Sequence, residues 1–116
     1  MAWEVEFTDE FGEWWEGLTV AAQTDVDATV LVLRQFGPEL TRPLADTVRN
    51  SRFANMRELR VQHGGRPYRI LYAFDPRRTA ILLLGGDKTG NSRWYDEYIP
   101  KADAIYEEHL REIGEQ

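Results

Sequence analysis

Hydrophobic positions in the first third of the chain follow a two-residue period and then a helical one. Residues 3–7 (W-E-V-E-F) alternate apolar and acidic side chains, which predicts a strand with one buried face. A Thr-Asp pair that can cap a helix follows, and the pattern then predicts helices over residues 10–18 and 20–36. The second helix should end at the Gly-Pro pair that follows it. This part is therefore predicted to be a strand followed by a helical hairpin.

The second half of the chain has shorter apolar runs separated by turn residues. Residues 38–54 form a connector of mixed polarity. Beyond the connector the pattern predicts three strands, over residues 56–61 (M-R-E-L-R-V), 68–74 (Y-R-I-L-Y-A-F) and 79–84 (T-A-I-L-L-L). A Gly-Gly turn and an Asp-Pro turn separate them, so they should form an antiparallel meander. The third strand is almost wholly apolar, which predicts a central position with both faces buried.

A polar loop and a terminal helix complete the predicted elements. Residues 85–91 (G-G-D-K-T-G-N) are predicted to be a flexible loop after the third strand, and residues 93–98 to be helical or irregular. Pro100 would occupy the first turn of a helix over residues 101–113. The expected fold class is α+β, with an N-terminal strand and helical hairpin packed on a small antiparallel sheet and a C-terminal helix. A chain of 116 residues is expected to be a single domain, residues 1–116.

Composition limits the classes of function. Hydrophobic residues make up 42% of the chain and four are tryptophan, as is typical of a folded globule. There is no cysteine, and His63 and His109 lack metal-ligand spacing, so we expect no metal and no cofactor. The N-terminus is acidic, unlike a signal peptide, and no apolar run approaches the ~20 residues of a membrane span. We therefore expect a soluble cytoplasmic protein without a membrane partner.

Charge is divided unevenly along the chain. The net charge is -6, yet residues 42–94 hold eleven Lys or Arg and four Asp or Glu, a charge of +7, which leaves -13 for the remainder. This asymmetry indicates a surface that meets a polyanion. Ten of the eleven cations are arginine, which suits bidentate contacts with phosphate. Alternatively, the arginines are solvated and pair with the acidic helices.

Arginines of the predicted strands could form a phosphate-binding cluster. Alternate residues of a strand share a face, so Arg57 lies on one face of its strand and Glu58 and Arg60 on the other. The pattern allows two or three arginines to converge near the Lys88 loop and to stabilise charge on a phosphate, from among Arg57, Arg60, Arg66 and Arg69. Alternatively, Arg57 and Arg60 flank Glu58 on an exposed face.

Lys88 is the one lysine of the basic region. Its G-G-D-K-T-G loop lacks the full phosphate-loop pattern and is not followed directly by a helix, which argues against nucleotide binding of that type. Lys88 could neutralise a scissile phosphate or transfer a proton, or it could simply be solvated. His63, beside a Gly-Gly turn, could be a general base, but an exposed turn histidine is the simpler interpretation.

Aromatic residues follow Arg93. Trp94, Tyr95 and Tyr98 could stack on unpaired bases, as aromatic side chains do in single-stranded RNA recognition. They could equally pack the terminal helix on the sheet, which is the favoured interpretation for Trp94 and Tyr98.

Three strings, in order, carry a resemblance to a known family. M-R-E-L-R-V, G-R-P-Y-R-I-L-Y and A-I-L-L-L-G-G-D-K-T-G together resemble the RelE/ParE superfamily of toxins, most closely its phage-derived HigB-like branch. The tail W-Y-D-E-Y-I-P-K-A-D-A-I-Y-E-E-H-L is similar to the C-terminal helix of that branch. The resemblance covers about residues 3 to 112 and implies a RelE-like α+β fold.

The resemblance also implies a function and a site. It implies the toxin of a type II toxin–antitoxin system, most often a ribosome-dependent, metal-independent mRNA endoribonuclease. The expected partners are the ribosome with its mRNA and a cognate HigA-like antitoxin with a helix-turn-helix domain. The residues that match the family's strings are Arg60, Arg69 and Lys88, which we expect to be the catalytic groups. As additional RNA-binding groups we expect Arg57, Arg66, Arg93 and Tyr95. We expect no direct DNA binding by this chain alone, because no basic recognition helix is visible.

The chain departs from many relatives in ways that leave alternatives open. Those relatives have two lysines in the loop and a basic charge, whereas here Asp87 precedes Lys88 and the net charge is -6. The alternatives are a ParE-like toxin that binds and poisons gyrase, and a catalytically inactive relative.

Overall fold

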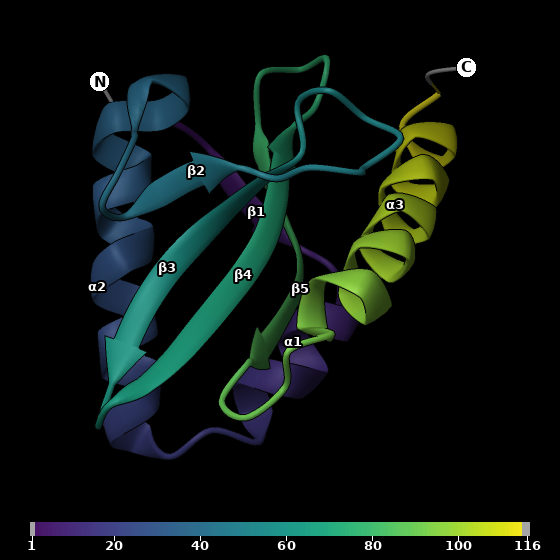
Figure 1. Cartoon of the computed structure of the whole chain (residues 1–116). Coiled ribbons are helices and arrows are strands. Elements are labelled where there is room, and N and C mark those ends of the chain that lie inside the picture. Colours follow the sequence, from purple (N-terminus) through teal and green to yellow (C-terminus); the bar gives the residue numbers. More distant parts are fainter. Residues whose placement is uncertain (1, 115–116) are drawn as a thin grey trace.

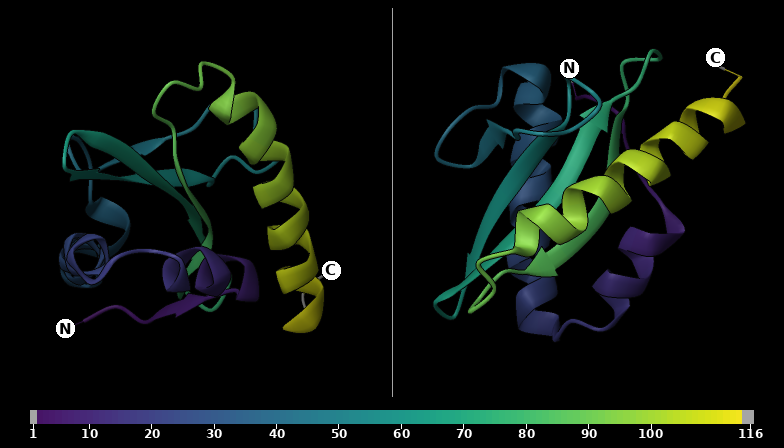
Figure 2. Two further views of the ribbon diagram at one scale, coloured as in Figure 1. Left: turned by 90° about the horizontal axis from the view of Figure 1, so that it is seen from below. Right: turned by 45° about the vertical axis from the view of Figure 1, so that its right-hand side comes forward.

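Within residues 2–114, which the computed structural model describes, a five-stranded sheet carries helices on both faces (Figure 1). The strand order is β1-β5-β4-β3-β2. The strands are β1 (Val5–Phe7), β2 (Ala45–Thr47), β3 (Arg57–His63), β4 (Arg66–Phe74) and β5 (Ala80–Asp87). The helices are α1 (Asp9–Glu16), α2 (Val20–Phe36), the short 3-10 helix η1 (Gly37–Glu39) and α3 (Trp94–Glu112). Figure 2 shows α1 and α2 on one side of the sheet and α3 on the other.

The predicted α+β architecture is confirmed. β3, β4 and β5 form the antiparallel meander, and β1 pairs in parallel with β5. The helical hairpin is also present, with Thr8 and Thr19 accepting hydrogen bonds from backbone N–H groups at the two helix starts. One strand was not predicted: β2 lies within the expected connector and pairs with β3. Its three residues are too few to show a period.

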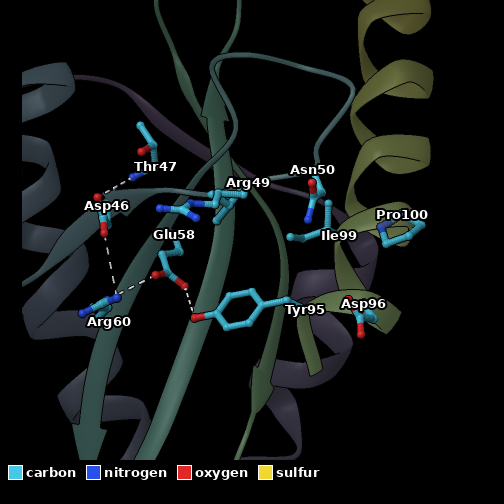
Figure 3. A pocket seen from close by; sticks show the side chains of 11 residues that line it. Asp46, Thr47, Arg49, Asn50, Glu58, Arg60, Tyr95, Asp96, Ile99 and Pro100 are labelled. Atoms are coloured by element: carbon cyan, nitrogen blue, oxygen red, sulfur yellow. Dashed lines mark hydrogen bonds and ion pairs between the residues drawn. The ribbon is translucent and has the colours of Figure 1, made fainter. Parts of the chain in front are cut away.

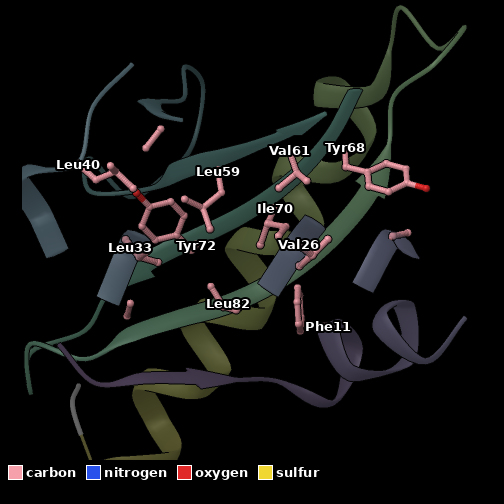
Figure 4. Close-up of a cluster of buried hydrophobic side chains, with 13 residues drawn as sticks. Phe11, Val26, Leu33, Leu40, Leu59, Val61, Tyr68, Ile70, Tyr72 and Leu82 are labelled. Carbon is pink, nitrogen blue, oxygen red and sulfur yellow. The ribbon is translucent and has the colours of Figure 1, made fainter. Parts of the chain in front are cut away.

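The two faces of the sheet bury separate apolar clusters. Tyr72, Ile70, Leu59 and their neighbours pack against α1 and α2, as Figure 4 shows. On the opposite face the side chains that pack against α3 belong to Met56, Leu71, Ala73, Ile81 and Leu83. Both faces of β4 and β5 are therefore buried, as predicted for the third strand. The same face of β3 and β4 also carries polar side chains, those of Glu58, Arg60 and Arg69.

The prediction for the terminal helix needs a correction. α3 begins at Trp94, so Pro100 lies inside the helix and not in its first turn. Trp94 is 1% exposed and stacks on Tyr98 with 4.5 Å between ring centroids. These packed rings hold the first turn of the helix on the sheet, which explains why it starts well before the proline.

Residues 85–91 were predicted to be a loop, and this was wrong for the first three. Gly85, Gly86 and Asp87 belong to β5. A Cβ on Gly85 would collide with the Trp14 ring, and a Cβ on Gly86 would lie 2.6 Å from Nε1 of Trp94. The two glycines therefore let an indole ring close on each face of the strand.

A β-bulge decides which side chains reach the α3 face. Leu84 pairs with Leu71 and Leu82 pairs with Tyr72, so Leu83 is an extra residue in β5. An inserted residue moves every later side chain of a strand to the other face. Beyond the bulge Gly86 lies opposite Arg69, and the backbone N–H of Lys88 continues the ladder to Pro67.

Candidate functional site

Two arginines and a buried glutamate meet on the α3 face of the sheet. Arg60 of β3 lies directly opposite Arg69 of β4. Nε of Arg60 donates to Oε2 of Glu58 at 3.2 Å, and Nε of Arg69 lies 3.7 Å from Oε1 of the same carboxylate. Glu58 is 3% exposed and Arg69 is 9% exposed. A buried carboxylate therefore offsets two cations that the strand register places face to face.

Tyr95 and Lys88 complete the cluster from other elements. The Tyr95 hydroxyl, from the first turn of α3, donates to Oε1 of Glu58 at 2.6 Å. The Lys88 ammonium lies over the Tyr95 ring, 5.2 Å from its centroid, which is a cation–π distance. Burial and the hydrogen bond to Glu58 raise the pKa of Tyr95 above its ordinary value, against the opposing effect of Arg69. Tyr95 therefore keeps its proton at neutral pH and acts as a donor.

Asp87 is turned away from its neighbour Lys88. Its carboxylate accepts hydrogen bonds from Nη1 of Arg66 at 3.0 Å and from the backbone N–H of Thr89 at 2.9 Å. Burial raises the pKa of Asp87, but the hydrogen bonds from Thr89 and Arg66 outweigh it, so the pKa lies below its ordinary value. The carboxylate is thus ionised and occupied by Arg66, and it shapes the loop that presents Lys88.

A pocket of about 430 Å³ opens beside the cluster (Figure 3). One end holds Glu58, Arg60 and Tyr95, and the pocket continues between β2 with its following loop and the first turns of α3. The lining there belongs to Asp46, Thr47, Val48, Arg49, Asn50, Asp96, Ile99 and Pro100. Asp46 also lies 3.9 Å from Nη2 of Arg60 and is bound by Arg42, whose guanidinium lowers the pKa of the Asp46 carboxyl.

The structure brings together four of the seven sequence-predicted site residues: Arg60, Arg69, Lys88 and Tyr95. Arg57 lies on the opposite face of β3, where Nη1 donates to the carbonyl of Pro38. Arg66 sits at the start of β4 in its ion pair with Asp87. Arg93 is exposed at the start of α3, with Nε 4.0 Å from Asp96. These three lie outside the cluster.

The remaining candidates have structural contacts. Nδ1 of His63 lies 2.6 Å from Asp25 of α2, and the ring stacks on Tyr68, so His63 belongs to the α2 face. Nε2 of His109 lies 2.9 Å from Asp75. Trp94 packs in the core beneath α3, as favoured above. No histidine of residues 2–114 therefore contacts the arginine cluster.

Glu58 is the member that the sequence interpretation missed. It was considered only as an exposed acid between two arginines, whereas its side chain is 4% exposed and contacts Arg60, Arg69 and Tyr95. Strand alternation did place Glu58 on the face of Arg60. The missing information was that α3 covers this part of the sheet, which a local pattern does not show.

Two further properties concern the residues that the structure describes. Among residues 2–114, no group of three or more His, Cys, Asp or Glu side chains is placed to hold a metal ion. Within the same range, no helix combines the length and the apolar character that crossing a membrane requires.

The fold is that of the RelE toxins. A mutant of the Escherichia coli toxin RelE, in the free state, aligns with a TM-score of 0.64 over 87% of this chain and 98% of the RelE chain, at 14% identity. The archaeal RelE–RelB complex from Pyrococcus horikoshii OT3 gives a TM-score of 0.58 over 79% of this chain and 100% of the matched chain, also at 14% identity. At such identity the likeness establishes the fold.

The chain belongs to the family of Gp49-like phage-derived proteins, whose profile matches residues 13–107. Its relatives include two proteins of Mycobacterium tuberculosis (strain ATCC 25618 / H37Rv) that are named as toxins. HigB3 is 50% identical over 98 residues, which is 84% of each chain. HigB2 is 46% identical over 107 residues, 90% of this chain and 53% of HigB2, so this chain spans about half of that relative. The family predicted from the three strand strings is confirmed.

Proposed function

We propose that this protein is the toxin of a type II toxin–antitoxin pair and that it cleaves mRNA on the ribosome. Membership of the Gp49-like family and the toxin names of HigB2 and HigB3 support the first part. The observation that carries the second part is the cross-strand pair of Arg60 and Arg69 with Lys88 beside it. Guanidinium groups of this kind stabilise the charge that develops on a phosphate during displacement.

The proposed reaction is an attack of a ribose 2′ oxygen on the adjacent phosphate. The bond between O2′ and phosphorus forms while the bond between phosphorus and O5′ breaks, which leaves a 2′,3′-cyclic phosphate and a 5′ hydroxyl. Arg60 and Arg69 would stabilise the added negative charge of the pentavalent state. Arg60 lines the pocket beside the cluster, which supports this role.

Two groups of the cluster fit the proton transfers. Glu58 lines the pocket and is the carboxylate of the cluster, so we assign it the role of general base, which accepts the proton of the 2′ hydroxyl. The Lys88 ammonium would give a proton to the departing O5′, which balances the step. Tyr95 is unsuited to be the base because its raised pKa keeps it protonated. It would instead hold the Glu58 carboxylate in position.

The arrangement of the cluster supports the proposed dependence on the ribosome. Glu58 is buried and shared between Arg60, Arg69 and Tyr95, so free RNA has to be aligned closely before its 2′ hydroxyl reaches this carboxylate. A ribosome that fixes the mRNA backbone would provide that alignment. The proposed site of action is therefore the translating ribosome of the cytoplasm.

A cognate antitoxin is the proposed partner. RelE is found with an antitoxin in the RelBE complex of Escherichia coli and in RelBE2 of Mycobacterium tuberculosis. For this chain we propose a HigA-like antitoxin with a helix-turn-helix domain, covering either the basic strand face or the acidic helices. The charge division supports two such faces, since residues 42–94 carry +7 and the remainder -13.

Primer extension on a translated mRNA tests the proposal, with and without ribosomes. We expect cuts that follow the reading frame and that require ribosomes. Lys88→Ala should lower the cutting rate by about 100-fold, as loss of a proton-transfer group does. The matched control is Lys101→Ala, because Lys101 also lies over a tyrosine ring, 5.0 Å from the Tyr98 centroid, but outside the cluster. Absence of cuts by the wild type, or equal cutting by folded Lys88→Ala, would overturn the proposal.

A further inference from the structure

The pocket beside the arginine cluster extends further than the proposed phosphate chemistry needs. Its catalytic end is formed by Glu58, Arg60 and Tyr95. The other end is walled by Ile99 and Pro100 of α3 and by the loop after β2, and nothing in the proposed cleavage uses these groups. Figure 3 shows the Asn50 side chain extending from that loop toward Ile99, while the Arg49 guanidinium lies above Glu58.

The chemistry of the walls favours a nucleobase as occupant. Three acids (Asp46, Glu58 and Asp96) and two arginines (Arg49 and Arg60) line the pocket, so a second phosphate placed there would lie close to carboxylates. A base is uncharged and flat, with apolar faces and a polar edge. Val48, Ile99 and Pro100 offer apolar contact, and about 430 Å³ lies within the range of small-ligand pockets. A nucleotide with its phosphate at Arg60 would have its base within reach of this space.

Asn50 is the side chain of this end best suited to read a base edge. Its amide offers a donor and an acceptor together, the combination with which asparagine pairs to base edges. Its backbone has φ 70°, in the left-handed region where asparagine is tolerated better than most residues. This conformation, in the loop that follows β2, sets the direction in which the side chain leaves the loop.

We propose that this pocket holds the base of the nucleotide next to the scissile phosphate and that the Asn50 amide selects that base. The inference rests on the proposed function, because it assigns the substrate's base to the same site. Arg49 would lie against the face of the base, as guanidinium planes do in RNA recognition. Ile99 and Pro100 would make apolar contact with the base and would not discriminate between the four bases.

The test compares cut-site sequences from a library of mRNAs randomised around the cleavage position. Asn50→Gly removes the amide and keeps the left-handed backbone accessible, so it should flatten the base preference at one position beside the cut. Asn50→Asp retains acceptors and loses the donors. It should shift that preference about tenfold toward bases that present amino donors, such as guanine or cytosine.

A matched control separates base reading from added charge. Gln35→Glu makes the same amide-to-carboxylate change on the exposed side of α2, in the opposite helical layer, and should keep the wild-type preference. If the wild type cuts mRNA and both Asn50 variants cut with the same base preference as the wild type, this inference is overturned and the proposed function is not. A wild-type protein that makes no cuts would overturn the proposed function as well.

A neutralisation assay on the same variants distinguishes a nucleobase from an antitoxin side chain as the occupant of the pocket. If the Asn50 variants keep the wild-type cut sites but are no longer neutralised by the antitoxin, the pocket holds an antitoxin side chain and the inference is wrong. A changed base preference together with normal neutralisation supports a nucleobase.

Discussion

Arg60 and Arg69 face each other directly across β3 and β4, and one buried carboxylate, that of Glu58, contacts both guanidinium groups. Opposed like charges on neighbouring strands destabilise a sheet. Glu58 therefore has a structural role that is independent of any role in catalysis. It contacts both guanidinium groups at once, and it also accepts a hydrogen bond from Tyr95 at the start of α3.

Replacing Glu58 with glutamine should affect stability and cleavage together. Glu58→Gln leaves two facing arginines without their counter-charge, so we expect a loss of about 2–4 kcal/mol in the free energy of unfolding. Cleavage should fall by about 100-fold or more, as is typical for loss of a general base. Urea unfolding and primer extension measure the two effects. The control is Glu107→Gln, which removes an exposed partner of Arg52 and Arg111 and should unfold like the wild type.

If Glu58→Gln unfolds at the same urea concentration as the wild type, the carboxylate does not offset the arginine pair. If it is destabilised but cleaves normally, the carboxylate positions the arginines without taking the proton. The two readouts therefore separate the structural role from the catalytic one.

Tyr72 provides a prediction about alkaline pH. Burial raises the pKa of Tyr72 to about 12, and its hydroxyl has no hydrogen-bond partner among residues 2–114. The folded state thus holds this proton more tightly than the unfolded state. The contribution of this protonated hydroxyl to the free energy of unfolding is complete below about pH 10. It is lost as pH rises toward about 12, an effect of about 2–3 kcal/mol.

Tyr72→Phe should therefore be as stable as the wild type, or more stable, at pH 7, because no hydrogen bond is lost. Between about pH 10 and 12 the wild type should lose stability relative to the variant. Urea unfolding at neutral pH and at two alkaline pH values within that window checks this difference. Parallel stability curves for the two proteins over this range would show that the hydroxyl ionises without penalty.

Local sequence patterns predicted much of this fold because each main element has a clear period. Strand alternation placed Glu58 with Arg60 on one face and Arg57 on the other, as the structure has them. The helical hairpin and meander were likewise signalled by caps and turns. Which face is covered by α3 depends on contacts distant in sequence, and so the burial of Glu58 was missed.

The bulge at Leu83 is a second feature that local sequence patterns could not predict. A run of apolar residues on a strand buried on both faces carries no period, so nothing in A-I-L-L-L reveals that one residue is unpaired. That residue decides whether Gly86 faces Arg69, and thus on which side Lys88 emerges. The sequence pattern allowed Lys88 to converge with the arginines, but the bulge that brings it there could not be predicted from a local pattern.

Asp75 joins the β4–β5 turn to the end of α3 and gives a prediction at acid pH. Its buried carboxylate contacts His109 and Arg77 and accepts the backbone N–H of Thr79. Burial raises the pKa of Asp75, but these hydrogen bonds outweigh it, so the pKa lies below its ordinary value. Because this pKa is lowered, the contribution of the ionised Asp75 carboxylate to the free energy of unfolding is present above about pH 4. It is lost as pH falls through the pKa that Asp75 has in the folded state.

Asp75→Asn should cost about 3 kcal/mol at pH 7, because it removes the charge that pairs with Arg77. The variant should also lose less stability than the wild type when the pH falls from about 5 to about 3. Unfolding in urea across this range measures both effects, and hydrogen exchange should show faster opening of the last turns of α3. Equal acid sensitivity of the two proteins would assign the effect to other carboxylates.

Gly86 links the packing of Trp94 to the proposed chemistry. A Cβ at this position would lie 2.6 Å from Nε1 of Trp94, which is too close for either group to keep its place. Gly86→Ala should therefore displace the first turn of α3 and destabilise the protein by about 1–3 kcal/mol. Because Tyr95 follows Trp94, its hydrogen bond to Glu58 should weaken and cleavage should fall more than stability alone explains.

Gly12→Ala is the matched control for this change. Gly12 lies within α1, and an added Cβ would be 3.6 Å from the Phe7 ring, an ordinary contact. Alanine favours the helix over glycine, so this variant should gain about 0.5–1 kcal/mol. Thermal unfolding of both proteins and primer extension at a temperature where both are folded separate the effects. If Gly86→Ala is as stable and as active as Gly12→Ala, the contact between β5 and Trp94 does not position Tyr95.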